Sequence, residues 1–464
     1  MAARARPHDE ALIEGLRAIV GDRGLVTGTD VRARSCDPFR PVPPLGPAIV
    51  RPACTEDVSR ILSFCQARGQ GVVTHGGRTG VAGGAYADAD DIVLSLERMN
   101  RIEEVDPVGP CMTVEAGVTI EAVQNAAAER DLLYPVDFGA KGSATVGGSI
   151  ATNAGGNRVV RWGMTRANVL GIEAVLADGT VVSAMNRLVK NNTGYDLKHL
   201  FIGSEGTTGI VTRAVLRLVA APCSQHVAFV GLAGFAAVLD LLSRARRLPA
   251  LSAFEVMWQD YYVLVAGHDA TRMPIDTRFP FCVLVETMGY DAETDAVLFD
   301  RFLEGAYAAG VIGDAVMANS GQQAADLWRV REGSEIIVRA MSPFVSFDIS
   351  VDIRRAEAFV AEARAALEER FARVRTVTFG HLGDNNLHLG IHIGPDTAAR
   401  EIEIEHCVYG VVGEFGGALT AEHGVGRLKR AFLPGHVSPG ALDVMRRVRS
   451  ALDPDHALNR KVLF

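Results

Sequence analysis

The sequence predicts an α+β protein of at least two domains, and three observations support this. The chain has 464 residues, 48% of them hydrophobic, which is enough to bury more than one core. Three glycine-rich loops lie among short β-type runs in its first half. From about residue 221 these loops disappear, and strand and helix signals alternate. We therefore expect one domain over residues 1–220 and a second from residue 221 onward.

The charge and the cysteine content narrow the class of protein. The formal net charge is -8, so nothing indicates a nucleic acid as partner. The seven cysteines are odd in number and show no paired spacing, which is typical of reduced thiols in an intracellular protein. No secretory signal is visible, and no apolar run reaches the roughly 20 residues that a membrane span needs. We expect a cytoplasmic protein without a transmembrane segment.

The first domain begins with elements that lead into a glycine-rich loop. We expect a helix over 10–20, an extended stretch over 37–52, a helix capped by Thr55 and a strand over 71–74. The loop that follows, 75–84, reads HGGRTGVAGG, and its glycines can point backbone N–H groups at an anion. It is neither a Walker A loop nor a Rossmann fingerprint, because no GKS or GKT and no helix follows. An ordinary glycine turn is the alternative.

Two more loops of this kind follow. Strands over 92–96 and 113–119 and a helix over 120–130 lead into 136–156, where six residues are Gly and six are Ala or Ser. A surface with so little bulk usually lies against a flat or phosphorylated group. The third loop, 200–211, is expected to be bracketed by strands. Three such loops are much harder to explain as coincidental turns than one.

The second domain carries a candidate metal site. His381 and His388 stand seven residues apart across a turn, and Glu422 follows later in the run TAEHGVG. Two imidazoles and one carboxylate suit a Zn²⁺-like ion that keeps open positions. The alternative is two core histidines and a surface glutamate.

Taken together, these motifs resemble a known family. VTHGGRTGVAGGA, GAKGSATVGGSIATNAGGNRVVRWGMTRANV and KNNTGYDLKHLFIGSEGTTGIVTRAVLRL resemble the FAD-binding domain of the vanillyl-alcohol oxidase/p-cresol methylhydroxylase flavoprotein superfamily. Within it, the chain is most similar to the D-2-hydroxyacid dehydrogenases, which act on D-lactate, D-2-hydroxyglutarate or glycolate. The resemblance implies a two-subdomain FAD-binding domain, an α+β substrate (cap) domain over 221–420 with the metal site, and a segment 421–464 that returns to the FAD domain.

The resemblance also assigns residues to the cofactor. It implies that the loop 75–80 wraps the FAD pyrophosphate, that small residues of 143–156 line the flavin and ribityl chain, and that the adenine lies near Ile210. The C-terminal motif would pack beside the flavin. Attachment is expected to be noncovalent, although His75 stands near the site of covalent linkage in some relatives. The residues implied are Gly76, Gly77, Arg78, Thr79, Gly80, Gly83, Ser143, Val146, Gly147, Gly148, Asn153, Gly156, Ile210 and Asn459.

The same resemblance implies the chemistry. In the metal-dependent branch, HLGDGNLH and AEHG supply the ligands and the base, and this chain matches at His381, His388 and Glu422. His423 falls on the residue that removes the hydroxyl proton, a task that suits a neutral imidazole. The metal, Zn²⁺ by expectation with Mn²⁺, Fe²⁺ and Co²⁺ open, would bind the hydroxyl and carboxylate oxygens. Hydride would then pass to flavin N5.

An arginine is implied as the receptor for the substrate carboxylate. Trp328 to Glu332 resemble the family's W-x-x-R-E helix, and Arg331 matches its carboxylate-binding arginine. A planar guanidinium is a suitable bidentate partner for a planar anion. The alternative is an exposed helical arginine paired with Glu335, one turn further on.

Departures from the family pattern indicate the substrate. Hydroxyglutarate-specific relatives place Thr and Lys where this chain has Glu335 and Ser346, and Asn where it has Gly390. The second carboxylate of a substrate such as 2-hydroxyglutarate would face an acidic residue and would find no lysine to pair with. We expect a monocarboxylate with an apolar or variable side chain, such as D-lactate, D-2-hydroxybutyrate or D-mandelate. A D-2-hydroxyglutarate dehydrogenase and a glycolate oxidase subunit are the alternatives.

Two other classes of protein explain fewer of these motifs. A metal-dependent hydrolase would leave the three glycine loops unexplained. A non-catalytic flavin-binding subunit would leave His423 and Arg331 without roles. The expected electron acceptor is an electron-transfer protein or a quinone, and a homodimer is one arrangement open to the chain.

Overall fold

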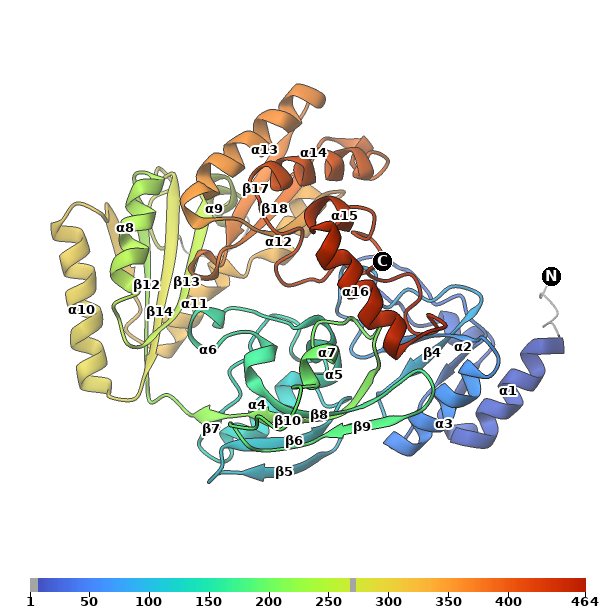
Figure 1. Ribbon diagram of the computed structural model, residues 1–464. Coiled ribbons are helices and arrows are strands. Elements are labelled where there is room, and N and C mark those ends of the chain that lie inside the picture. Colours follow the sequence, from blue (N-terminus) through green and yellow to red (C-terminus); the bar gives the residue numbers. More distant parts are fainter. Residues whose placement is uncertain (1–6, 268–272) are drawn as a thin grey trace. The chain divides into compact units, whose positions relative to one another are not determined.

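The computed structural model describes residues 7–267 and 273–464, and its contacts divide the chain into two compact units. Unit 1 comprises the chain up to Gly156, then Gly163–Ala221 and Glu422–Phe464, whereas unit 2 comprises Asn157–Trp162 and Pro222–Ala421 (Figure 1). Helices and strands are mixed in both units, so the α+β class is confirmed. Among the described helices, none has the length and apolar character to cross a lipid bilayer.

The first sheet of unit 1 has four strands in the order β1-β2-β4-β3, with parallel pairing of β4 to both β2 and β3. Two amphipathic helices, α1 and α3, pack against each other and bury Leu16 and Ile61 in one core with Val72 and Ile92. The bounds are β1 Leu25–Thr27, β2 Ala48–Val50, β3 Gly71–His75, β4 Asp91–Ser95, α1 Pro7–Val20, α2 Thr29–Arg32 and α3 Thr55–Gln66.

The second sheet of unit 1 has five antiparallel strands in the order β5-β6-β10-β8-β9. Helices α4 and α5 share a core with it, in which Val123 and Ile150 meet Val114 and Ile172. The bounds are β5 Ile102–Asp106, β6 Cys111–Glu115, β7 Leu132–Leu133, β8 Val169–Val175, β9 Val181–Ala184, β10 Ile210–Arg217, β11 Val219–Ala220, α4 Ile120–Ala128, α5 Val146–Thr152 and α7 Lys198–Phe201.

Three local predictions differ from the structure. Thr55 is the first residue of α3 and not its cap, because its hydroxyl donates to Glu173 Oε1 at 2.7 Å. The third glycine loop is preceded by the short helix α7, not by a strand. The small-residue stretch contains the helix α5, which its glycines disfavour and which tertiary packing of Val146 and Ile150 stabilises.

Unit 2 is built on a seven-stranded antiparallel sheet in the order β15-β12-β14-β13-β17-β18-β16. Helices α8 and α10 pack together on β12 and β14, and α9, α11 and α12 form a second group. Phe229, Met257 and Leu284 share a core with Tyr261 of α9 and Trp328 of α11. Alternation along β13 and β14 puts Glu255 and Glu286 on this second face.

The bounds in unit 2 are β12 Ser224–Leu232, β13 Leu251–Trp258, β14 Phe281–Gly289, β15 Asp314–Met317, β16 Val345–Ser350, β17 Arg375–Gly380, β18 Asn386–His392, α6 Val159–Trp162, α8 Phe235–Ala245, α9 Gln259–Ala266, α10 Ala292–Ala308, α11 Gly321–Arg331, α12 Ser334–Met341, α13 Ala356–Arg370 and α14 Glu401–Glu414.

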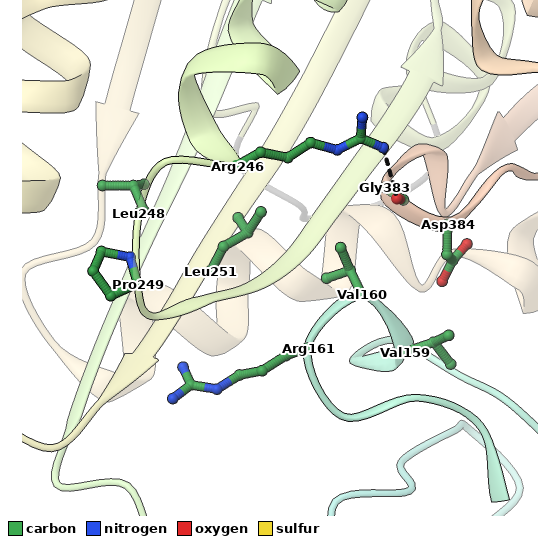
Figure 2. Close-up of a pocket in the computed structure, with 9 residues that line it drawn as sticks. All are labelled: Val159, Val160, Arg161, Arg246, Leu248, Pro249, Leu251, Gly383 and Asp384. Carbon is green, nitrogen blue, oxygen red and sulfur yellow. Dashed lines mark hydrogen bonds between the residues drawn. The ribbon is translucent and has the colours of Figure 1, made fainter. Parts of the chain in front are cut away.

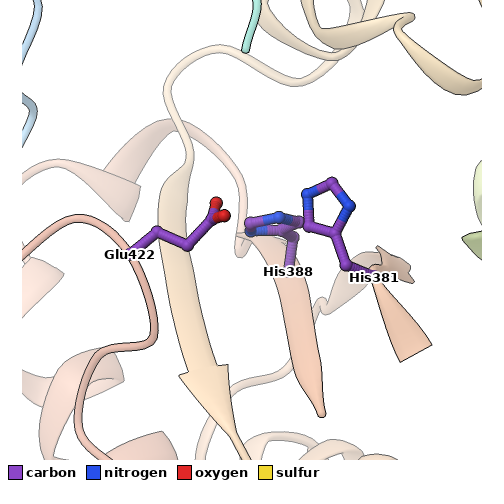
Figure 3. Close-up of side chains that lie close together, drawn as sticks. All are labelled: His381, His388 and Glu422. Atoms are coloured by element: carbon purple, nitrogen blue, oxygen red, sulfur yellow. The ribbon is translucent and has the colours of Figure 1, made fainter. Parts of the chain in front are cut away.

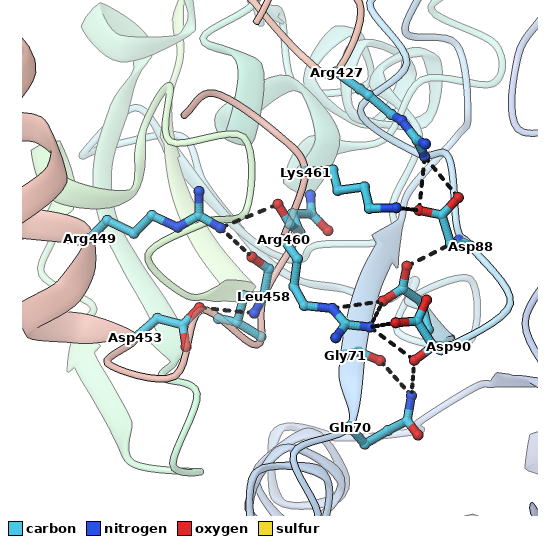
Figure 4. A network of polar contacts seen from close by, with 12 residues as sticks. Gln70, Gly71, Asp88, Asp90, Arg427, Arg449, Asp453, Leu458, Arg460 and Lys461 are labelled. Atoms are coloured by element: carbon cyan, nitrogen blue, oxygen red, sulfur yellow. Dashed lines mark hydrogen bonds and ion pairs between the residues drawn. The ribbon is translucent and has the colours of Figure 1, made fainter.

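The C-terminal segment of unit 1 carries α15 (Leu433–His436) and α16 (Pro439–Leu452) and ends against β3. Val72 N donates to Ala457 O at 2.9 Å, and the buried Arg449 donates to the carbonyls of Leu458 and Val462. Figure 4 shows how Arg427, Arg460 and Lys461 reach the carboxylates of Asp88 and Asp90 in the neighbouring loop. Arg460 also pairs with Asp91. These cations balance negative charge of the acidic cluster.

Candidate functional site

The first two glycine loops of unit 1 meet so closely that side chains would not fit between them. A Cβ atom added at Gly76 would lie 2.5 Å from Thr145 Oγ1, and one at Gly77 would lie 2.0 Å from Ser143 O. Gly80 is different, because a Cβ atom there would meet nothing within 4 Å. Gly76 and Gly77 are thus required for packing, whereas Gly80 borders open space.

Asn459 joins the third loop to the end of β3. Its Nδ2 donates to Glu205 O at 2.7 Å, and its Oδ1 accepts from Thr74 N at 3.1 Å. The side chain is buried, and Gly206 lies against it. The structure therefore brings together all three glycine loops and the C-terminal residue that the sequence assigned to the same site.

Four polar atoms around these loops are buried and have no hydrogen-bond partner among the described residues. They are Thr74 Oγ1, His75 Nδ1, Ser149 Oγ and Ser204 Oγ. Burial lowers the pKa of His75 to about 4, so the imidazole is neutral; its Nε2 donates to Ala85 O at 2.8 Å and Nδ1 keeps a lone pair. Buried polar groups are costly when unpaired, so a ligand rich in donors and acceptors fits this cradle. A dinucleotide with phosphates and hydroxyls, such as FAD, has that character.

The remaining residues assigned to the cofactor lie in the same loops. Two of them use their side chains inside the protein: Arg78 Nη1 donates to Ser35 O at 2.9 Å, and Asn153 Oδ1 accepts from Arg166 N at 2.9 Å. Gly147 packs on Ala116, and Ile210 is buried at the start of β10. Thr79, Gly83, Val146, Gly148 and Gly156 complete the set on these segments. Arg78 and Asn153 would therefore meet a ligand mainly through their backbone.

The segment 422–428 is held within unit 1 by the same loops. Gly156 N donates to Glu422 Oε1 at 2.6 Å, which orients that carboxylate. Val425 N and Gly426 N donate to the Glu205 carboxylate at 2.9 and 2.7 Å. Glu205 was not identified from the sequence, although it has a left-handed φ of 53° and is buried. Burial raises its pKa to about 7, despite the two N–H groups and the charge of Lys429.

In unit 2 the two predicted histidines meet at one end of the sheet. His381 follows β17 and His388 lies in β18; their rings are 5.4 Å apart and nearly perpendicular. Asp348, buried in β16, lies opposite His388 and accepts from Ala421 N at 3.2 Å. Glu422, the next residue, begins the C-terminal segment of unit 1. These three side chains, drawn in Figure 3, form a group of potential metal ligands.

Glu255, which belongs to none of the sequence motifs, links His381 to Arg331. Arg331 Nε and Nη2 each lie 2.8 Å from Glu255 Oε2, and His381 Nδ1 is 2.9 Å from Oε1. Burial alone would raise the pKa of the Glu255 carboxyl, but the charges of His381 and Arg331 outweigh it and hold the pKa below its ordinary value. The available signal was a lone acid in the buried strand LSAFEVMW.

The burial of Arg331 decides between its two interpretations, a receptor for the substrate carboxylate and an exposed helical arginine. Its side chain is buried, with 6% exposure, and its Cζ lies 4.8 Å from the centre of the Phe379 ring. The exposed helical arginine paired with Glu335 is therefore wrong. Among the described residues, none accepts a hydrogen bond from its Nη1, so part of the guanidinium is left for another anion.

The positions expected to select the substrate are neighbours in unit 2. Ser346 in β16 pairs with Gly390 in β18, so a Lys and an Asn at these positions would lie side by side. A Cβ atom at Gly390 would lie 2.9 Å from Val377 Cγ2 and would crowd it. Glu335 is exposed in the first turn of α12, which packs on β18.

Two cavities of unit 2 lie away from these charged residues. One, of about 540 Å³, is formed by α6, the segment before β13 and the turn between the histidines, where Arg246 donates to Gly383 O at 3.3 Å (Figure 2). The other, of about 550 Å³, is lined by Trp258, Asp260 and Arg364 among others. Neither cavity is lined by His381, His388 or Arg331, so these three residues belong to neither cavity.

Comparisons with known proteins match this chain to two families and to several relatives. The family described as "FAD linked oxidases, C-terminal domain" matches residues 221–462, and "FAD binding domain" matches residues 46–184. A D-2-hydroxyglutarate dehydrogenase of Xanthomonas citri pv. viticola is 38% identical over 90% of this chain and 89% of its own length. A putative mitochondrial D-lactate dehydrogenase of Schizosaccharomyces pombe is 36% identical over 88% of this chain and 79% of its own.

Solved structures confirm the expected fold. p-Cresol methylhydroxylase with substrate bound superimposes with a TM-score of 0.79 at 15% identity, covering 99% of this chain and 98% of that chain. Alkyldihydroxyacetonephosphate synthase superimposes with a TM-score of 0.75 at 15% identity, covering 99% and 85%. The matched domains and relatives together show that this chain belongs to the family of FAD-linked oxidases, in its branch of D-2-hydroxyacid dehydrogenases.

Proposed function

We propose that the protein oxidises D-2-hydroxyacids to 2-oxoacids, using FAD and a divalent metal ion. The observation that carries this proposal is the buried group of unit 2, in which a guanidinium that can receive a carboxylate lies beside two imidazoles that can bind a metal. The relatives named D-2-hydroxyglutarate and D-lactate dehydrogenase support it.

The cofactor is proposed to occupy the cradle of unit 1. FAD supplies the acceptor for the hydride when it is bound. The backbone of 75–80 would hold its phosphates, and the buried hydroxyls of Ser149 and Ser204 would gain partners. Because His75 is neutral and enclosed, its lone pair on Nδ1 is suited to accept a hydrogen bond.

The metal is proposed to bind His381, His388 and Glu422, with Zn²⁺ favoured by the mixed nitrogen and oxygen ligands and Mn²⁺, Fe²⁺ and Co²⁺ as alternatives. A bound ion supplies a Lewis acid for the substrate hydroxyl. Arg331 would hold the substrate carboxylate through the side of its guanidinium that faces away from Glu255. His423, next to Glu422, would accept the hydroxyl proton while the Cα–H leaves as hydride.

We further propose a preference for monocarboxylates such as D-lactate, D-2-hydroxybutyrate and D-mandelate. Ser346 and Gly390 offer no positive charge where they pair across β16 and β18, and Glu335 adds a negative one to the helix that packs there. A second carboxylate would be repelled or left unpaired. D-2-hydroxyglutarate is the second candidate, because several relatives carry its name.

The test is a panel of D- and L-2-hydroxyacids assayed anaerobically with an artificial dye acceptor, before and after removal of metal by a chelator. We expect a yellow protein that the D-acids bleach, with kcat/KM higher for D-lactate than for D-2-hydroxyglutarate. A colourless protein that takes up no FAD would reject the enzyme. Full activity after removal of metal would reject only the proposed metal dependence. A preference for D-2-hydroxyglutarate would reject only the proposed preference for monocarboxylates.

The electron acceptor is proposed to be an electron-transfer protein or a quinone. The measurement is the reoxidation rate of the substrate-reduced protein with a soluble quinone, with an electron-transfer flavoprotein and with oxygen. Reoxidation by oxygen at the rate of turnover would reject this acceptor and would make the protein an oxidase.

A further inference from the structure

Two glutamates without exposed surface lie on one face of the sheet of unit 2. The side chains of Glu255 in β13 and Glu286 in β14 are 1% and 0% exposed, and each pairs with an arginine. Glu286 accepts from Arg158 Nε at 3.1 Å and from Trp328, Ser252 and Gln225. Only Glu255 also contacts an imidazole, that of His381. The two residues therefore share burial and a charged partner but differ in one contact.

The contact between Glu255 and His381 determines where the imidazole proton lies. A carboxylate only accepts hydrogen bonds, so His381 Nδ1, 2.9 Å from Oε1, must carry the proton. In the neutral imidazole, Nε2 then carries the lone pair that a metal ion requires, and Arg331 Nη2 lies 3.5 Å from this atom. Arg331 Nε and Nη2 each lie 2.8 Å from Oε2, and His381 Nδ1 is also 2.8 Å from this oxygen. One carboxylate thus fixes both groups.

We propose that Glu255 is a positioning residue that fixes the tautomer of His381 and the orientation of Arg331 together. The inference rests on the function proposed above and deepens it. It implies that the affinity for metal and the affinity for the substrate carboxylate depend on one residue that contacts neither ligand.

If Glu255 has this role, a single substitution should weaken both metal binding and binding of the substrate carboxylate. In E255Q, the amide oxygen accepts only part of the hydrogen bonds, and the amide NH₂ faces donors on Arg331 or His381. The imidazole loses its fixed tautomer, and the guanidinium loses its buried counter-charge. E286Q is the matched control, since it removes a charge of equal burial from the neighbouring strand and touches no imidazole.

The experiment measures Zn²⁺ affinity by competition with a chelator, the visible bands of bound Co²⁺, FAD content and KM for D-lactate in the wild type, E255Q and E286Q. For E255Q we expect a loss of about 10–100-fold in Zn²⁺ affinity, altered Co²⁺ bands and unchanged FAD content. KM should rise about tenfold at a saturating metal concentration. E286Q should keep the Zn²⁺ affinity and the Co²⁺ bands of the wild type.

Two results would overturn the inference alone. One is an E255Q protein with wild-type Zn²⁺ affinity and Co²⁺ bands; the other is an equal loss in E255Q and E286Q, which would show a merely structural role. If the wild type itself binds neither Zn²⁺ nor Co²⁺, the metal part of the proposed function fails and the inference fails with it.

Discussion

The cradle of glycine loops in unit 1 and the charged group of unit 2 are built by different means. Around the cradle the chain removes side chains, and at Gly77 it leaves only 2.0 Å between a would-be Cβ and Ser143 O. In unit 2 the chain instead buries full charges. Glu255 forms an ion pair with Arg331 and accepts a hydrogen bond from His381. Backbone groups suit a large ligand with many weak contacts, whereas a small substrate needs a few strong and directional ones.

The largest effect is expected at His388, and it tests whether the chemistry resides in unit 2. H388A should lose its metal, and turnover should fall by more than the roughly 10–100-fold that loss of an outer partner costs. The flavin spectrum should stay unchanged, because the cradle belongs to unit 1. His392, on the same strand and bonded to Pro343 O, provides the control H392A, which should keep its metal. Equal turnover in H388A and wild type would reject the proposal that a catalytic metal ion binds His388.

The next effect concerns Glu205, a buried carboxyl group beside the glycine loops of unit 1. Its pKa is raised to about 7 from an ordinary 4.5, so the folded state resists ionisation and loses stability as the pH rises between these values. The loss amounts to about 3 kcal/mol at roughly 1.4 kcal/mol per pH unit. E205Q should abolish it, as urea unfolding of both proteins at pH 5 and pH 7.5 would show. The same pH dependence in both proteins would contradict the assignment.

Two glycine substitutions distinguish glycines that allow the loops to pack closely from glycines that leave space for a ligand. G77A should destabilise the FAD-free protein by about 1–3 kcal/mol, because the new Cβ meets the backbone of Ser143. G80A should change the stability of the FAD-free protein by less than about 0.5 kcal/mol, since nothing lies within 4 Å, yet it should weaken FAD binding. Thermal unfolding without FAD and a titration with FAD measure both. An unaffected FAD affinity in G80A would place the cofactor elsewhere.

The smallest effect is expected at Ser346. S346K would place a cation opposite Gly390, and we expect kcat/KM for D-2-hydroxyglutarate to rise about fivefold, as for an exposed ion pair of up to about 1 kcal/mol. S346Q has similar length without charge and should leave the ratio of D-lactate to D-2-hydroxyglutarate unchanged. An equal gain in both variants would show that charge at this position does not select the substrate.

What could be predicted from the sequence also differs between the two regions. The glycine loops are visible because each is a continuous run of small residues, and the structure brings them together. Glu255 was missed because its partners lie 76 and 126 residues away, so no local spacing reveals them. The same reason explains the wrong pairing of Arg331 with Glu335, which rested on helical spacing alone. The placement of Asn157–Trp162 in unit 2 likewise depends on the distant Glu286, which Arg158 contacts.

The hydrogen bond from Asn459 to Glu205 has a consequence for biosynthesis. The two residues are 254 positions apart, so at about 5–20 residues per second a ribosome needs roughly 13–50 s to travel from one to the other. Most of unit 2 is synthesised during that interval, and the nascent loops of unit 1 still lack their contact with Asn459. If FAD binds as proposed, we therefore expect its capture to follow synthesis of the segment that carries Asn459.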